Sequence, residues 1–135
     1  MATITANITL NTDITGYSAT QSMTLSKLGS TTGIENATGI ATRKFSATTA
    51  VVIIEQDEVT DSKASKVYMR NTGSSKETFF HLAINASAAA DATTETIGRL
   101  YGGDWMLVPY EGAVNLTVAP STANDMTLEY GLFYE

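Results

Sequence analysis

Strict alternation of apolar and polar residues is the first pattern in the chain. Residues 3–10 read TITANITL, in which Ile4, Ala6, Ile8 and Leu10 alternate with threonine and asparagine. A period of two is typical of a strand that buries one face. The segment therefore predicts a half-buried strand near the start of the chain.

Further strands are predicted along the rest of the sequence. Residues 48–56 (TTAVVIIEQ) contain a short continuous apolar run, which is typical of a strand buried on both faces. Residues 66–75 predict a strand that ends in an Asn-Thr-Gly turn. Residues 77–85 predict the next strand. Its alternation sets one face against the other: Phe80, Leu82 and Ile84 opposite Phe79, His81 and Ala83.

The C-terminal segments follow the same period. Residues 113–120 and 126–134 alternate and predict two more strands, the second of which pins the C-terminus in a sheet. Between the central and C-terminal strands, residues 86–96 (ASAAADATTET) have high helix propensity but no apolar stripe. A loop or a single helical turn is expected there.

The segment 97–112, IGRLYGGDWMLVPYEG, carries the only tryptophan and the only Gly-Gly pair. Two strand-like segments flank Gly102 and Gly103, and glycine supplies the positive φ that tight hairpin turns demand. The pattern predicts a β-hairpin. Both faces of its second strand are apolar, which predicts a central strand with Trp105 in the core. Pro109 then marks the end of that strand or a bulge.

Eight or nine short strands separated by polar turns indicate an all-β antiparallel sandwich. Jelly-roll and immunoglobulin-like strand orders give similar alternation, so both remain open. The 135 residues suit a single domain over residues 1–135. Residues 1–20 are threonine-rich and poor in aromatic side chains, which is consistent with an extended N-terminal arm or an edge strand.

Composition supports the all-β interpretation. Charged residues make up 16% of the chain, and 22 threonines favour pleated, half-buried surfaces over helices. No cysteine is present, which excludes disulfides and thiolate metal sites. Neither a secretory signal nor a membrane-spanning stretch is visible in the sequence, so synthesis in a cytoplasm and no membrane partner are expected.

Charge is unevenly distributed along the sequence. The formal net charge is −6, and the first 90 residues contain seven bases and seven acids, so the excess acid lies in residues 91–135. The excess can form a solvated acidic face or a face matched to a basic partner. A nucleic-acid partner is not expected, because no cluster of Lys and Arg is present to neutralise phosphates.

Candidate catalytic and metal-binding residues are few. His81, the only histidine, would need an orienting carboxylate and a nucleophile to act as a base, so a structural or surface role is expected. The segment EQDEVTD, with Glu55, Asp57, Glu58 and Asp61, resembles a cation-binding loop only by charge, because it lacks the glycine and the terminal glutamate spacing of an EF-hand calcium-binding loop. We expect a solvated turn, with weak calcium binding between subunits as the alternative.

Two further patterns have a structural and a functional interpretation. Trp105 with Asp104 and Glu111 could suggest a sugar site or paired carboxylates for glycoside hydrolysis, but the alternation favours a core tryptophan. Four Asn-Xaa-Thr/Ser triplets match the glycosylation pattern, and such triplets are expected by chance in a chain rich in threonine and asparagine. They begin at Asn7, Asn36, Asn85 and Asn115. No cofactor-binding motif and no metal-ligand spacing is present, and no enzyme activity is expected.

Several short motifs follow one another in a fixed order: Arg70-Asn71-Thr72, residues 97–100 followed by Gly103-Asp104-Trp105, Val108-Pro109, and the closing EYGLF at residues 129–133. With these motifs, residues 66–135 resemble small structural proteins of tailed-bacteriophage virions. The resemblance does not cover residues 1–50. It implies a β-sandwich accessory protein of the virion without catalytic residues.

The resemblance carries a set of functional expectations. It implies a decoration or cement protein on the outer surface of a phage head, with a tail, baseplate or fibre component as the alternative. The expected partners are further copies of this chain in a symmetric oligomer such as a trimer, and the major capsid protein or other virion proteins. A carbohydrate-binding β-sandwich module that uses residues 105–111 is a third interpretation, from a different class.

Overall fold

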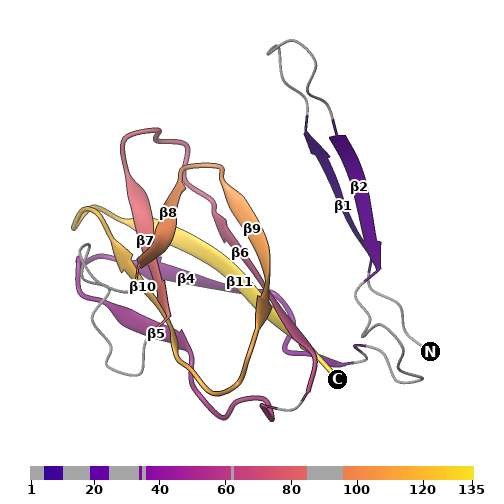
Figure 1. Cartoon of the computed structure of the whole chain (residues 1–135). Coiled ribbons are helices and arrows are strands. Elements are labelled where there is room, and N and C mark those ends of the chain that lie inside the picture. The colour runs from indigo at the N-terminus through magenta and orange to yellow at the C-terminus, as the bar shows by residue number, and fades with distance from the viewer. Residues whose placement is uncertain (1–4, 11–18, 25–33, 35, 62, 85–95) are drawn as a thin grey trace.

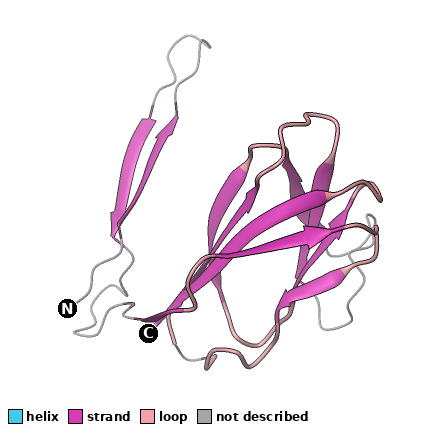
Figure 2. Cartoon of the chain, turned by 180° about the vertical axis from the view of Figure 1, so that it is seen from behind, coloured by secondary structure: helices cyan, strands magenta, loops and turns pink. Residues whose placement is uncertain are grey.

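The computed structural model describes residues 5–10, 19–24, 34, 36–61, 63–84 and 96–135. Every regular element in these ranges is a strand (Figures 1 and 2). The strands are β1 (Thr5–Leu10), β2 (Ala19–Thr24), β3 (Asn36–Ala37), β4 (Ala41–Phe45), β5 (Val51–Ile54), β6 (Ser65–Asn71), β7 (Phe79–Ile84), β8 (Thr96–Tyr101), β9 (Trp105–Tyr110), β10 (Leu116–Pro120) and β11 (Met126–Tyr134). The described residues include no helix that could cross a membrane.

Nine of the described strands form a two-layered antiparallel sandwich, which confirms the predicted fold class. One sheet has the order β3-β11-β6-β9, with β4 also paired to β11, and the other has the order β5-β10-β7-β8. From β4 onward the chain alternates between the sheets, except at β7 and β8, which are neighbours. This interleaved order is that of a jelly roll and not of an immunoglobulin-like sandwich.

The core lies between the two sheets and is built by the inward residues of the alternating patterns. Val67 and Met69 of β6 and Leu128 of β11 are fully buried and face Phe80 and Val118 of the other sheet. The rings of Phe45 and Phe80 meet edge to face across the layers, with centroids 5.3 Å apart. Side chains of this size contribute roughly 1.5–3 kcal/mol each when they are buried.

Strand β7 follows its predicted alternation for most of its length. Phe80 and Leu82 lie on the buried face, but Ile84, which the alternation grouped with them, is 44% exposed and Ala83 is fully buried. The register between β7 and β8 shifts between Leu82 and Ala83. The extra residue is Ile97 on β8, because the adjacent residues Leu82 and Ala83 pair with Gly98 and Thr96. A bulge leaves its extra residue unpaired and locally disrupts the ladder. The single-strand pattern contains no signal for this change.

The predicted hairpin at Gly102 and Gly103 is wrong. Strand β8 pairs with β7 in the four-stranded sheet, whereas β9 pairs with β6 in the five-stranded sheet. The two glycines form a tight turn that carries the chain from one sheet to the other (Figure 1). Both flanking strands are consequently edge strands, each with one open side.

Strands β1 and β2 form a separate two-stranded sheet. They pair with each other from Thr5↔Thr24 to Leu10↔Ala19, and neither pairs with a strand of the sandwich. We call residues 5–10 and 19–24 the N-terminal hairpin. Both views show it standing clear of the sandwich (Figures 1 and 2). Among the described residues, β1 thus pairs with β2 and with neither edge of the sandwich sheets.

The C-terminus is pinned in the five-stranded sheet, as predicted. Strand β11 pairs with β6 over seven residues and with β3 and β4 on its other side. Beyond its end, the Glu135 amide donates to the Ala64 carbonyl at 3.0 Å. The expected loop or helical turn at residues 86–96 lies outside the described residues, except for Thr96, which begins β8.

We predict that Gly102→Ala destabilises the fold. A Cβ at Gly102 would lie 2.2 Å from the Ser75 carbonyl oxygen and 2.7 Å from the Ser75 amide nitrogen. The backbone of the loop after β6, which contains Ser75, would have to move. We therefore expect a loss of about 1–3 kcal/mol in the free energy of unfolding. Gly98→Ala, three residues before the turn begins at Tyr101, is the control, because nothing lies within 4 Å of its Cβ. Equal unfolding midpoints in urea for both variants would contradict the prediction.

Candidate functional site

The turn between β8 and β9 is fixed by its own backbone and by the loop after β6. The Asp104 amide donates to the Tyr101 carbonyl at 2.9 Å, and Gly103 has a φ of +87°. Positive φ at the third position of a four-residue turn is the geometry for which glycine is favoured. The amides of Gly102 and Gly103 donate to the carbonyls of Ser75 and Asn71. The turn is therefore a rigid corner.

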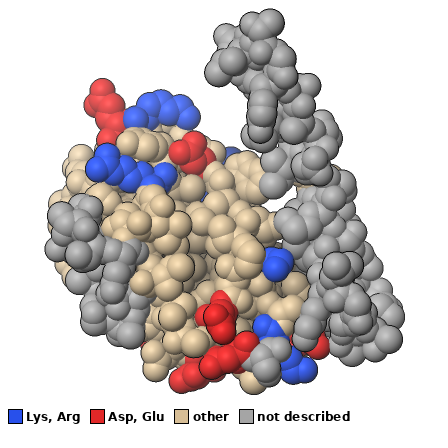
Figure 3. All heavy atoms as spheres, viewed as in Figure 1, with Lys and Arg blue, Asp and Glu red and all other residues tan. Residues whose placement is uncertain are grey.

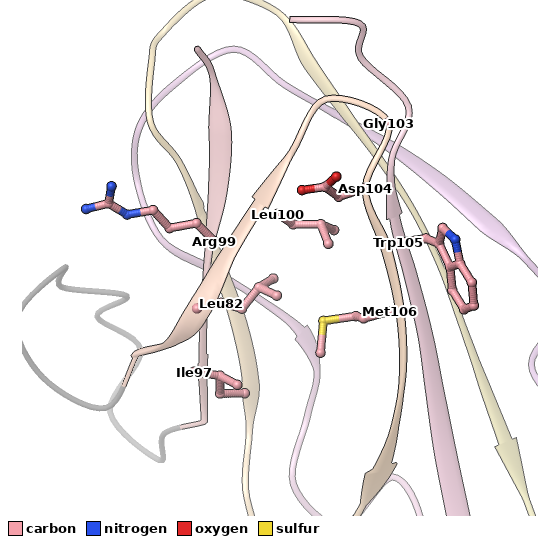
Figure 4. Close-up of a pocket in the computed structure, with 9 residues that line it drawn as sticks. Leu82, Ile97, Arg99, Leu100, Gly103, Asp104, Trp105 and Met106 are labelled. Carbon is pink, nitrogen blue, oxygen red and sulfur yellow. The ribbon is translucent and has the colours of Figure 1, made fainter. Parts of the chain in front are cut away.

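A shallow groove opens where β8 and β9 diverge from this corner. It has a volume of about 530 Å³, and its apolar walls are formed by Leu82, Ile97, Leu100 and Met106. Figure 4 shows Met106 pointing into the groove and Arg99 pointing away from it. The groove exists because the two edge strands belong to different sheets and leave the side of the sandwich open.

Trp105 is not in the core, contrary to the sequence prediction. Its side chain is 45% exposed, and Figure 4 shows it directed away from the groove. The reason is that β9 is an edge strand: Met106 and Val108 pack on the core, whereas Trp105 lies opposite Arg70 on the outer face. The prediction of a central strand was wrong for the same reason. Pro109 lies within this edge strand, one residue before its end.

The outer face of the five-stranded sheet carries an exposed apolar surface. Register places Leu107 opposite Tyr68 and Pro109 opposite Lys66, and it places Phe133 opposite Lys66 on the other side. Alternation puts these residues on the face that points away from the core. We call this surface the outer patch; its members are Ile40, Tyr68, Trp105, Leu107, Pro109 and Phe133.

Gly131 makes room for the chain segment that crosses the outer face of β11. A Cβ at Gly131 would lie 2.8 Å from Ile40 Cδ1 and 2.8 Å from the Gly39 carbonyl oxygen. Residues 39 and 40 therefore cross directly over β11, and Ile40 adds its side chain to the patch with 53% of its area exposed. Gly39 makes this crossing with a φ of +82°.

An acid and a base lie opposite each other beside the outer patch, and Lys66 lies between Pro109 and Phe133. Glu129 lies opposite Arg70 across β11 and β6. The Tyr68 hydroxyl donates to Glu129 Oε1 at 2.9 Å. Burial raises the pKa of Tyr68, and the hydrogen bond to Glu129 raises it further. Opposite charges placed across neighbouring strands stabilise a sheet, so this surface presents apolar area beside a compensated pair.

His81 belongs to a row of stacked side chains on the four-stranded sheet. Its ring meets Phe79 edge to face with centroids 4.8 Å apart, and its cross-strand partner is Arg99. The Arg99 guanidinium lies 4.6 Å from the centre of the Phe79 ring, which also contacts Tyr101. Nδ1 of His81 is buried and has no hydrogen-bond partner among the described residues. The surroundings are those of a structural histidine.

His81 also makes stability depend on pH. Burial lowers its pKa, and the positive charge of Arg99 lowers it further. The unfolded chain then binds a proton near pH 6.5 that the folded chain resists. The stability from neutral His81 is present above about pH 6.5 and is lost as the pH falls through the lower folded value. We expect His81→Gln to lose less stability than the natural chain between pH 7.5 and 5.5 in urea unfolding. Equal losses would contradict this.

The acidic segment with Glu55, Asp57, Glu58 and Asp61 is a packed turn at one end of the sandwich. Figure 3 shows acidic side chains gathered at that lower end. The Asp57 amide donates to the Gly112 carbonyl at 2.7 Å, and Val59 is buried. Within the described ranges, no three carboxylate, histidine or cysteine groups come close enough together to hold a metal ion.

Tyr110 ties this turn to the following loop. Its hydroxyl donates to the Val114 carbonyl at 2.8 Å and lies 3.2 Å from the Glu55 carbonyl. Burial raises the pKa of Tyr110 to about 12, with a further contribution from the neighbouring acids Glu58, Asp57 and Asp61. The neutral hydroxyl thus remains a donor at all physiological pH values.

The acidic last third of the sequence does not form one acidic face among the described residues. Asp125 Oδ2 lies 2.6 Å from Lys44 Nζ, and Glu135 Oε1 lies 3.6 Å from Lys63 Nζ. Bases from the earlier part of the chain thus meet acids from the later part, because β11 lies between β4 and β6. Two acids of the last third are thus each paired with a base from the earlier part of the chain.

Comparison with known proteins adds only a distant structural similarity. No protein-family model matches the chain, and no curated protein matches it. Among solved structures, the crystal structure of Aeromonas hydrophila PliG, a periplasmic lysozyme inhibitor of g-type lysozyme, is similar with a TM-score of 0.38 and 13% identity. The match covers 73% of this chain and 86% of that chain. We draw no functional argument from it.

Proposed function

We propose that this chain is a non-enzymatic structural protein of a virion, a decoration protein that binds the outer surface of a phage head. The observation that carries the proposal is the outer patch: a broad apolar surface, with Trp105 at 45% exposure, on a rigid sheet. Exposed apolar surfaces of this kind mark protein–protein contacts. The jelly-roll order supports the same class, because viral capsid domains use it.

The sequence resemblance over residues 66–135 supports a virion role as well. Within it, Gly103-Asp104-Trp105 forms the corner of β8 and β9, and Phe133 belongs to the outer patch. Such a protein would be made in the host cytoplasm and would bind the major capsid protein or other virion proteins. Many weak contacts repeated over a lattice raise the effective affinity without a tight single site.

The location in the particle is the first prediction to test. We expect gold-labelled antibody against this chain to decorate the whole head of intact particles from the source phage. Label confined to the tail or to one vertex would overturn the decoration role in favour of a tail, baseplate or fibre component. An absence of label on every particle would overturn the virion proposal. Antibody against the major capsid protein is the positive control for labelling.

A carbohydrate-binding module is the second candidate, and the exposure of Trp105 favours it. Exposed aromatic rings can stack on apolar faces of ligands while polar neighbours orient them. Asp104 lies beside Trp105, although its Oδ2 already accepts the Tyr101 amide at 3.0 Å. Glu111 follows at the other end of β9. The two carboxylates thus flank the strand and do not converge on Trp105 from one side.

The two candidates differ in what protects Trp105. We expect acrylamide to quench the fluorescence of this single tryptophan, and we expect soluble sugars to leave the quenching unchanged, at sub-micromolar protein concentration. The carbohydrate-binding alternative requires the opposite: a sugar that stacks on the indole would lower the quenching constant in a saturable way. Free tryptophan with the same sugars controls for solvent effects.

A further inference from the structure

The five-stranded sheet lacks a second covering layer among the described residues. Its inner face packs on the core, whereas its outer face exposes the outer patch defined above. The outer face also carries Lys66, Arg70 and Glu129, but its apolar members gain free energy when another layer removes them from water. Trp105 and Leu107 therefore lie on a face that is complete only when another layer covers it.

The N-terminal hairpin has an apolar face and no second layer that covers it among the described residues. A two-stranded sheet alone is marginally stable in water. Register and alternation assign positions 6, 8, 10, 19, 21 and 23 to one face of the hairpin. Five of these six positions hold Ala, Ile, Leu or Met, and neither strand contains a charged residue. The opposite face holds only Thr, Ser and Asn, and Asn7 on it is exposed.

The two surfaces match in size. Strands β1, β2 and β9 each have six residues, which corresponds to about 20 Å. The hairpin strands carry no charge, and on the outer face Arg70 lies opposite Glu129, whereas Lys66 lies between Pro109 and Phe133 at one end of the patch. Residues 39 and 40 cross over β11 at Gly131, so the open part of the patch is the part on β6 and β9. Two sheets can then stack face to face at about 10 Å.

We propose that the N-terminal hairpin of one copy covers the outer patch of a second copy, so that the chain assembles by exchange of hairpins. The occupant is a second copy because neither hairpin strand pairs with its own sandwich, and the hairpin stands clear of it in both views (Figures 1 and 2). This interface does not depend on the proposed role in a virion. It would form in the isolated protein.

The first test is the mass of the full chain in solution. Sedimentation at micromolar concentration should give a multiple of 14.3 kDa. Trp105→Glu should raise the dissociation constant of the oligomer at least tenfold. Ile97→Glu is the matched control, because Ile97 is 48% exposed, against 45% for Trp105, but lies on β8 outside the patch. A monomeric natural chain, or equal effects of both variants, would overturn the proposal.

The hairpin side is tested by two adjacent positions that face opposite ways. Ile8→Glu places a charge on the apolar face and should weaken assembly by a similar factor. Asn7→Glu places the same charge on the polar face, one residue away, and should leave the mass unchanged. Thermal unfolding followed by circular dichroism checks that the sandwich is intact in each variant. Weakened assembly in both, or in neither, would contradict the assignment of faces.

Cross-linking distinguishes a second copy from the same chain. The natural chain has no cysteine, so Ile8→Cys and Leu107→Cys each introduce a single thiol. A short bismaleimide should link the two variants when they are mixed, giving a band of two chains. Ile97→Cys in place of Leu107→Cys should not link to Ile8→Cys. If the double variant Ile8→Cys/Leu107→Cys links only within one chain, the hairpin covers its own sheet and the proposal fails.

Discussion

The packing of the two inner sheet faces against each other is the constraint on which the rest of the structure depends. Phe45 and Phe80 meet across the layers, and Val67, Leu128 and Val118 fill the space around them. Because successive strands serve opposite layers, most connections must cross the edge of the sandwich. The tight turn at Gly102 and Gly103 is one such crossing, and its closeness to Ser75 leaves no room for a side chain at Gly102. The groove and the edge position of β9 follow from the crossing.

Alternation in the sequence predicted the strands and the sandwich, because apolar residues at every second position of a strand form the face that packs on the core. It could not predict strand partners, since pairing depends on distant segments. Gly102 and Gly103 correctly marked a turn, but the same dipeptide serves a hairpin or a crossing between sheets. The alternation grouped Ile84 with Phe80 and Leu82 and did not anticipate that Ile84 is exposed, and the extra residue of β8 opposite Leu82 and Ala83 left no trace in the spacing.

Trp105 shows why the candidate site was misplaced. Apolar residues on both faces of a strand have two physical explanations: a central strand with both faces covered by the same chain, or an edge strand whose outer face awaits a partner. Sequence alternation treats them alike. Only the pairing of β9 with β6 alone decides for the second. The signal that could have separated them is Pro109, because proline within a strand is tolerated chiefly at an edge.

The same ambiguity applies to the N-terminal hairpin, whose alternation was as strict as that of any core strand. An apolar face is selected only if it is buried in the working state of the protein, and the sandwich closes its core without β1 and β2. The hairpin face and the outer patch are therefore two apolar surfaces that the fold of a single chain does not bury. A chain that remains a monomer would leave both of these apolar surfaces exposed to water. When the hairpin face packs against the outer patch, both surfaces leave water together. An assembly interface is therefore best sought where a single folded chain leaves apolar residues exposed.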